Sequence, residues 1–227
     1  PLICGSMGTQ PFYVKRYGKV NLKIYTSDKK LNYQVNWAGQ EILGLSELSI
    51  FSDADLTILG SKITKENKTW KPVWEQFSSI KDSYQQLELE IESNNAKGKL
   101  YARAYDEGVA FRFVLLKGNK PKTINFYCAY NLPKGSNYFA PSGESEPIGP
   151  LKLAELDNYQ KVGNKDGSRK NIQVPLLVET PNHSFVALLE SDLFVAKGFN
   201  NMNIDVNLAQ NKIVSANEAV LTENELI

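Results

Sequence analysis

The strongest constraint on the fold of this chain is an alternation of apolar and polar residues with a period of two. Leu87, Leu89 and Ile91 alternate with glutamates, so one side of this segment can pack while the other side carries carboxylates into water. Pairs of such runs joined by short polar turns predict antiparallel β-hairpins with one buried face. Two hairpins of this kind are predicted, at 20–37 and at 100–116.

The rest of the pattern favours an all-β protein. Short runs typical of strands follow at 122–132, 173–178, 185–189 and 204–208. No window keeps an apolar stripe at helical spacing through three turns, and the best helix candidate is the short segment 151–159. Many short strands joined by Gly, Pro and Asn turns predict a large antiparallel β-sandwich. The segment 133–171 is rich in Pro and Gly, and it is expected to be a long irregular connection.

Length and charge exclude several classes of function. The chain has 227 residues, with 26 Lys and Arg against 25 Asp and Glu, so we expect no nucleic-acid partner. Two cysteines and one histidine cannot build a Cys-rich or His-rich metal site. No segment has the roughly 20 consecutive apolar residues of a membrane-spanning helix. We predict one domain over 13–227, preceded by 1–12 as the remnant of a signal peptide or a tag.

Four glutamates are candidate site residues. Glu179 and Glu190 each end an apolar strand-like run. A carboxylate at the rim of a buried strand is costly unless it is paired, hydrogen-bonded or bound to a metal, and the alternative is that it reaches solvent. Glu144 and Glu146 lie in the irregular segment, where a carboxylate can either contact a ligand or remain solvated.

Two tryptophans also stand out. Trp70 and Trp74 bracket a proline, and aromatic faces of this kind can stack on the apolar face of a sugar ring. The two residues are therefore candidate substrate contacts. Because they are only four positions apart, they can instead pack inside the sandwich.

A longer motif resembles a known family. Residues 103–113 read RAYDEGVAFRF and closely resemble the signature Arg-Ala-Tyr-Asp-Asp-Gly-Val-Ala-Phe-Arg-Tyr of the N-terminal domain of glycoside hydrolase family 97. The segments 70–74, 174–180 and 187–193 are similar to further stretches of that domain, in the same order. The resemblance covers most of 13–227. It implies a galactose mutarotase-like β-super-sandwich at the N-terminus of an α-glucosidase or α-galactosidase that is periplasmic or secreted in bacteria.

The resemblance implies a supporting role in catalysis. In the family a central (β/α)8 barrel carries the catalytic groups, and a barrel takes about 250 residues of alternating strand and helix. This chain is shorter and β throughout, so we expect it to have no catalytic residue and no activity alone. It is expected to pack on the barrel of the same polypeptide, next to the oligosaccharide substrate.

The resemblance also implies a calcium ligand. The family's N-terminal domain contributes one glutamate to a bound calcium ion, and by position Glu179 is the first candidate and Glu190 the second. Calcium takes several oxygen ligands, so binding is expected only when the barrel is present.

Two alternatives come from other classes of protein. The tryptophans Trp37, Trp70 and Trp74 would also suit a stand-alone carbohydrate-binding module. A free-standing aldose mutarotase belongs to the same sandwich class, but that chemistry uses a pair of histidines with a glutamate. His183 is the only histidine, which argues against this alternative.

Overall fold

The structure is a computed structural model that divides into two compact units, each described separately below. The first unit comprises Pro1–Glu41 and Asp53–Lys120, and the second comprises Ile42–Ser52 and Pro121–Ile227. The prediction of one domain over 13–227 stays a prediction. The residues that the structure describes are 11–16, 19–51, 55–74, 76–94, 96–116, 123–142, 145–164, 168, 170–191 and 202–220.

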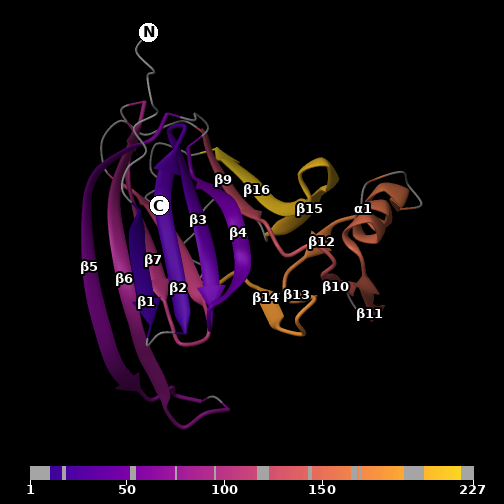
Figure 1. Ribbon diagram of the computed structural model, residues 1–227, viewed down its shortest axis with the longest axis horizontal. Helices are drawn as coiled ribbons and strands as arrows, with labels where there is room; N and C mark the ends of the chain where they lie inside the picture. The colour runs from indigo at the N-terminus through magenta and orange to yellow at the C-terminus, as the bar shows by residue number, and fades with distance from the viewer. Residues whose placement is uncertain are drawn as a thin grey trace. The chain divides into compact units, whose positions relative to one another are not determined.

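The first unit is a sandwich of two antiparallel sheets (Figure 1). Strands β1 and β2 of the first sheet contact β6 and β7 of the second. Tyr33 from β3 meets Phe111 from β8 edge-on, with the ring centroids 4.9 Å apart. The first sheet is formed by β1 (Phe12–Arg16), β2 (Val20–Ser27) and β3 (Lys30–Trp37), and the second by β5 (Thr57–Trp70), β6 (Ile80–Ser93), β7 (Ala96–Ala104) and β8 (Val109–Leu115).

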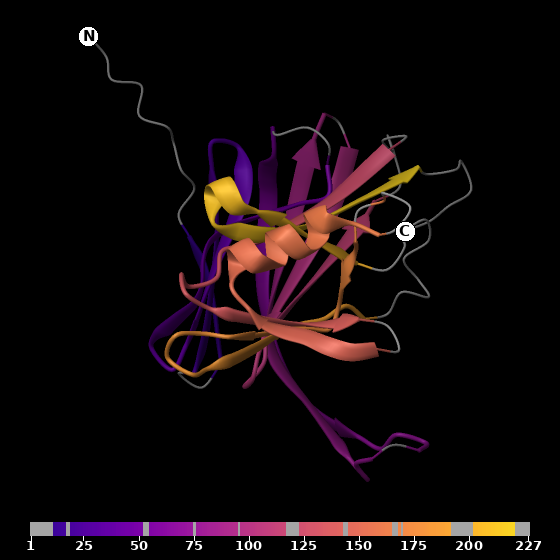
Figure 2. The same ribbon diagram turned by 90° about the vertical axis from the view of Figure 1, so that its right-hand side faces the viewer.

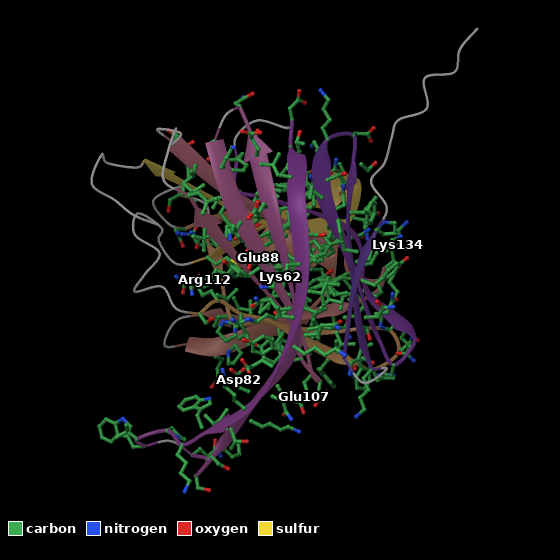
Figure 3. All side chains as sticks on the ribbon, turned by 90° about the vertical axis from the view of Figure 1, so that its left-hand side faces the viewer. Lys62, Asp82, Glu88, Glu107, Arg112 and Lys134 are labelled. Carbon is green, nitrogen blue, oxygen red and sulfur yellow. The ribbon has the colours of Figure 1, made fainter. Side chains whose placement is uncertain are left out.

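The period-two alternation explains why the two sheets pack. Leu87, Leu89 and Ile91 of β6 are completely buried, while the alternating glutamates lie on the opposite side of the sheet. Glu88, which pairs with Lys62 in the β5–β6 register (Figure 3), accepts a hydrogen bond of 2.6 Å from Lys99 Nζ. The two predicted hairpins are confirmed, because β2 pairs with β3 from Val20 to Ser27 and β7 pairs with β8 from Gly98 to Ala104, both antiparallel.

Strands β5 and β6 continue past the rest of their sheet. They pair without interruption from Gly60 to Trp70, which lies opposite Ile80. In contrast, β7 begins its pairing with β6 only at Gln85, opposite Ala104. The segments 66–70 and 80–84 therefore form a two-stranded ribbon that extends beyond β7, as Figures 1 and 3 show.

The second unit contains two further antiparallel sheets and one helix. One sheet has the order β4-β9-β16-β15-β12 within this unit, and the other has the order β11-β10-β13-β14. Strand β4 begins with two residues of the first unit. The elements are β4 (Gln40–Ser49), β9 (Thr123–Tyr130), β10 (Asn137–Ser142), β11 (Ser145–Leu151), α1 (Leu153–Val162), β12 (Ile172–Gln173), β13 (Leu176–Glu179), β14 (Phe185–Leu188), β15 (Asn203–Asn207), the 3-10 helix η2 (Leu208–Gln210) and β16 (Lys212–Val220).

Helix α1 confirms the predicted helix, and it packs against β15 (Figure 2). Leu156 is completely buried. The buried amide of Gln160 donates from Nε2 to the carbonyl oxygen of Ile204 (2.8 Å), and its Oε1 accepts from the backbone N–H of Val206 (3.1 Å). The side chain thus satisfies two backbone groups of β15, as buried polar groups require.

The prediction that 133–171 is an irregular connection is wrong, because the segment contains β10, β11 and α1. Prolines hid the strands: Pro147 and Pro150 interrupt the alternation, but β11 is an edge strand, where proline is tolerated. Among the described residues, no helix is long and apolar enough to cross a membrane.

Candidate functional site

The sheet β11-β10-β13-β14 carries the first of the predicted metal-binding glutamates. Glu179 is the last residue of β13, and it lies opposite Asn137 of β10 on one side and opposite Phe185 of β14 on the other. Its neighbours Leu176 and Val178 are buried. Because side chains alternate along a strand, Glu179 belongs to the face of the sheet that points away from this core.

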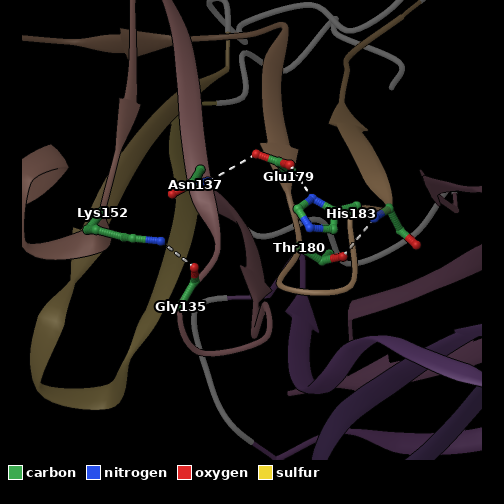
Figure 4. A network of polar contacts seen from close by, with 7 residues as sticks. Gly135, Asn137, Lys152, Glu179, Thr180 and His183 are labelled. Atoms are coloured by element: carbon green, nitrogen blue, oxygen red, sulfur yellow. Dashed lines mark hydrogen bonds and ion pairs between the residues drawn. The ribbon is translucent and has the colours of Figure 1, made fainter.

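Two side chains hold the Glu179 carboxylate (Figure 4). Asn137 Nδ2 donates to Oε2 over 3.0 Å, and His183 Nδ1 is hydrogen-bonded to Oε1 over 2.8 Å. A tight turn brings His183 back to the strand end: its backbone N–H donates to the carbonyl of Thr180, and Thr180 Oγ1 accepts from the N–H of Ser184. Only 19% of the Glu179 side chain is exposed.

These contacts keep Glu179 ionised. The hydrogen bond from Asn137 lowers the pKa of the carboxyl most, followed by the hydrogen bond to His183, and the charge of Lys152 lowers it further. Lys152 is itself held by a hydrogen bond of 2.6 Å from Nζ to the carbonyl of Gly135 (Figure 4). A hydrogen-bonded carboxylate with a lowered pKa is a competent ligand for a hard cation.

Apolar side chains surround this carboxylate on the exposed face of the sheet. Phe185 of β14 lies directly opposite Glu179 and is 63% exposed. Leu177, two residues before Glu179 on β13, is also exposed and points to the same side of the sheet. Leu177 lies between Phe139 of β10 and Ala187 of β14 in the register. We call these residues together with Glu179 the Glu179 face.

Glu190, the second predicted ligand, belongs to a different hydrogen-bond network. Its Oε2 accepts from the backbone N–H of Met202 over 2.6 Å. Met202 in turn accepts a weak hydrogen bond on sulfur from Tyr130. In the described part of the chain no hydrogen bond links Glu190 to Glu179, and no group of three or more His, Cys, Asp or Glu side chains could hold a metal ion. Each glutamate would therefore be a single ligand.

Trp70 and Trp74 lie at the end of the β5–β6 ribbon. Trp70 is the last residue of β5 and is 51% exposed, and Trp74, in the following loop, is 88% exposed. The alternative that they pack inside the sandwich is wrong, because both side chains are more than half exposed, and β7 does not pair with this part of the ribbon. Val73 and Phe77, which the sequence argument overlooked, are also exposed here. The sequence indicates them only as apolar residues within an otherwise polar segment.

The other two predicted contacts are less well defined. Glu146 lies in β11 and is exposed. Glu144 lies outside the described residues.

The long motif at 103–113 forms the β7–β8 hairpin and supports the ribbon. Arg103 donates from Nε to Gln86 Oε1 (2.7 Å) and from Nη1 to the hydroxyl of Tyr105 (3.3 Å), and its guanidinium lies 4.1 Å from the ring centre of Tyr84. The two tyrosine rings are 5.3 Å apart. The backbone N–H of Tyr105 closes the turn on the carbonyl of Gly108. Arg103 thus ties the base of the ribbon to β7.

Comparisons with known proteins identify the family and the fold. A family model described as Glycosyl-hydrolase 97 N-terminal matches residues 17–222. The crystal structure of a β-arabinopyranosidase aligns with a TM-score of 0.73 and 16% identity, over 91% of this chain and 35% of that one. A glycoside hydrolase family 97 enzyme from Pseudoalteromonas sp. strain K8, solved in complex with acarbose, aligns with a TM-score of 0.70 and 13% identity, over 93% of this chain and 32% of that one.

The matched proteins are much longer than this chain and distant from it in sequence. The chain spans about a third of the length of the solved structures that it matches, and at these identities the likeness concerns the fold alone. No curated protein matches the chain.

Proposed function

The chain belongs to the glycosyl-hydrolase 97 N-terminal family, and from this membership we propose that it is the non-catalytic domain of a longer α-glycoside hydrolase. The enzyme would be an α-glucosidase or an α-galactosidase that is periplasmic or secreted, and the chain would pack on its catalytic (β/α)8 barrel. The solved enzymes with the same fold support this proposal, because about two thirds of their length lies beyond the matched part.

The observation that carries the proposal is the arrangement of Glu179. An ionised carboxylate, fixed by Asn137 and His183, lies on an exposed face with apolar neighbours. Apolar surface of this kind is suited to being covered by another domain. We propose that the barrel covers the Glu179 face and that Glu179 contributes a ligand to calcium at the boundary.

The residues present fit one part of a calcium site. Calcium prefers carboxylate and carbonyl oxygens and takes six to eight of them. Glu179 has the right chemistry, and Glu190 is the second candidate, so the barrel would supply the remaining ligands. Calcium held at this boundary would supply positive charge that stabilises negative charge developing on the substrate. Asn137 and His183 would orient the carboxylate, as hydrogen-bonded partners of metal ligands do.

Activity assays on two lengths of the polypeptide test the main proposal. The longer polypeptide is obtained by expressing the chain with its adjoining coding sequence. We expect it to hydrolyse nitrophenyl α-glucoside or α-galactoside, and we expect the 227-residue chain to be inactive. Turnover by a clean preparation of the short chain, or an adjoining sequence that encodes no barrel, would refute the proposal.

Calcium titration of the longer polypeptide tests the ligand. Glu179→Gln removes the charge but keeps the shape, so we expect calcium affinity to fall about 10-fold or more, in line with other changes around metal sites. Glu146→Gln, at an exposed carboxylate of the same sheet, is the matched control and should leave the affinity unchanged. A loss of affinity in Glu190→Gln but not in Glu179→Gln would assign the ligand to Glu190 instead.

The exposure of Trp70 and Trp74 favours one second candidate, a stand-alone carbohydrate-binding module. In that case the two rings would contact an oligosaccharide. Titration of the 227-residue chain with malto-oligosaccharides checks this function, and tryptophan fluorescence that stays constant at millimolar sugar would exclude it.

A further inference from the structure

The β5–β6 ribbon ends in an exposed apolar tip. We call the segments 66–70 and 80–84, together with the described loop residues 71–74 and 76–79, the aromatic arm. Its tip consists of Trp70, Val73, Trp74 and Phe77, all of which are more than half exposed. Exposed apolar groups are common singly, but four such residues within one short stretch of chain, three of them aromatic, are typical of an interaction site.

The aromatic arm is a built element rather than a loose loop. Ser83 Oγ donates to Asn67 Oδ1 across the two strands (3.0 Å), and Lys68 Nζ pairs with Glu66 Oε2 (2.7 Å). At its base, Arg103 joins the ribbon to β7 through Gln86. The two strands that carry the tip are therefore paired with each other and tied to β7.

The tip is better suited to a protein pocket than to a sugar. Sugar-binding sites are concave and bury most of their ligand, whereas this tip is the end of a ribbon that extends beyond β7 and adds exposed Val73 and Phe77 to the two tryptophans. Pairing of β5 with a further strand along its free edge is also disfavoured. This edge strand contains three lysines, Lys62, Lys65 and Lys68, and lysines on an edge strand oppose such pairing. Contact is therefore expected through the tip.

We propose that the tip of the aromatic arm inserts into an apolar pocket on the catalytic part of the same longer polypeptide. This inference rests on the proposed function. The solved structures with this fold carry about two thirds of their length beyond the matched part, so a longer polypeptide of this kind would hold a large tethered partner for the arm. A tethered partner acts at millimolar effective concentration, whereas a second copy has to associate from dilute solution.

Hydrogen exchange measured by mass spectrometry on the 227-residue chain and on the longer polypeptide tests the docking. We expect the amides of 71–79 to exchange at least about 10-fold more slowly in the longer polypeptide. The segment 176–185, which carries the Glu179 face, is followed in the same samples. If 176–185 is protected and 71–79 is not, the arm inference is wrong while the proposed function stands. If neither segment is protected, both are wrong.

Paired substitutions separate docking from folding. In the 227-residue chain, Val73→Ser with Trp74→Ser should leave the melting temperature unchanged, because both side chains are exposed. In the longer polypeptide the same pair should lower it by several degrees and remove the protection of 71–79. Leu45→Ser, at a half-exposed leucine of β4, is the matched control and should have no such effect. Protection of 71–79 in the short chain by malto-oligosaccharides would overturn the inference in favour of sugar binding.

Discussion

Gly149 is the position where a single added methyl group should most damage the sheet that carries Glu179. It lies in β11 with a φ of +130°, a backbone conformation that side chains of L-amino acids rarely adopt. A Cβ atom built there would clash with the carbonyl oxygen of Tyr138 and lie 3.0 Å from the Cα of Phe139. Both contacts are with the backbone of β10, which pairs with β13 and supplies Asn137.

The size of the effect of Gly149→Ala follows from two separate costs. A residue held in such a disfavoured backbone region costs about 1–3 kcal/mol. Forcing a methyl group into a packed backbone contact costs about 1–3 kcal/mol more. We therefore expect a loss of about 2–6 kcal/mol in the free energy of unfolding, which for 150–250 residues lowers the melting temperature by about 2–4 °C per kcal/mol.

Alanine substitutions at two other glycines serve as controls that separate the cost of the backbone conformation from the cost of the steric clash. Gly39 has a φ of +83° but no atom within 4 Å of its Cβ position, so Gly39→Ala should cost only about 1–2 kcal/mol. Gly108 has open space and no positive φ, so Gly108→Ala should stay within about 0.5 kcal/mol or slightly stabilise the chain.

Calorimetric melting of the three variants provides the test, together with hydrogen exchange at 176–179. We expect Gly149→Ala to melt lowest and to speed exchange in β13, because β10 has to move. If Gly149→Ala melts no lower than Gly39→Ala, the backbone clash and the argument built on it are refuted.

Two pH-dependent predictions concern the same sheet. We expect Asn137→Ala to raise the pKa of Glu179, as measured by NMR titration of the carboxyl carbon, because the amide of Asn137 lowers that pKa most. The ionised Glu179 stabilises the fold fully at a pH above the pKa of a free glutamate, and this stabilisation is lost as the pH falls through the lowered pKa. The melting temperatures of wild type and variant should therefore converge in acid. A difference between them that stays constant with pH would contradict this. Burial raises the pKa of Tyr138 to about 12, and tyrosine ionises near 10 in the unfolded chain. Stability should therefore fall from pH 10 to 12, and Tyr138→Phe should make that fall less steep in urea unfolding, whereas equal slopes would contradict the assignment.

The parts of the fold that could be predicted from sequence are those where one face is buried and the other is wet. The alternation around Leu89 gives an unambiguous signal, because every second side chain is buried in the sandwich. The signal fails in β11, where Pro147 and Pro150 break the pattern without breaking an edge strand. It also fails in β5, where Ile63 faces the core side of the sheet but is half exposed.

The candidate site could be predicted only in part, because its residues come together through tertiary register. Glu179 was identifiable as an acid at the end of an apolar strand. Its partner Asn137 is 42 positions away, and only the β10–β13 register brings the two together. Whether Trp70 is buried or exposed could not be decided from its spacing, because the answer depends on where β7 ends.

The way Glu179 is held argues for a ligand role over a strand end that merely reaches solvent. Only 19% of the Glu179 side chain is exposed, so the carboxylate does not simply reach solvent, and the hydrogen bonds from Asn137 and His183 replace water that it has lost. Both bonds also fix the direction of the carboxylate, and His183 has a φ of +56°, which is uncommon for a residue other than glycine. Fixing one ligand before the others arrive lowers the entropic cost of completing a metal site. If that is its purpose, Asn137→Ala should weaken calcium binding to the longer polypeptide while leaving the fold of the short chain intact.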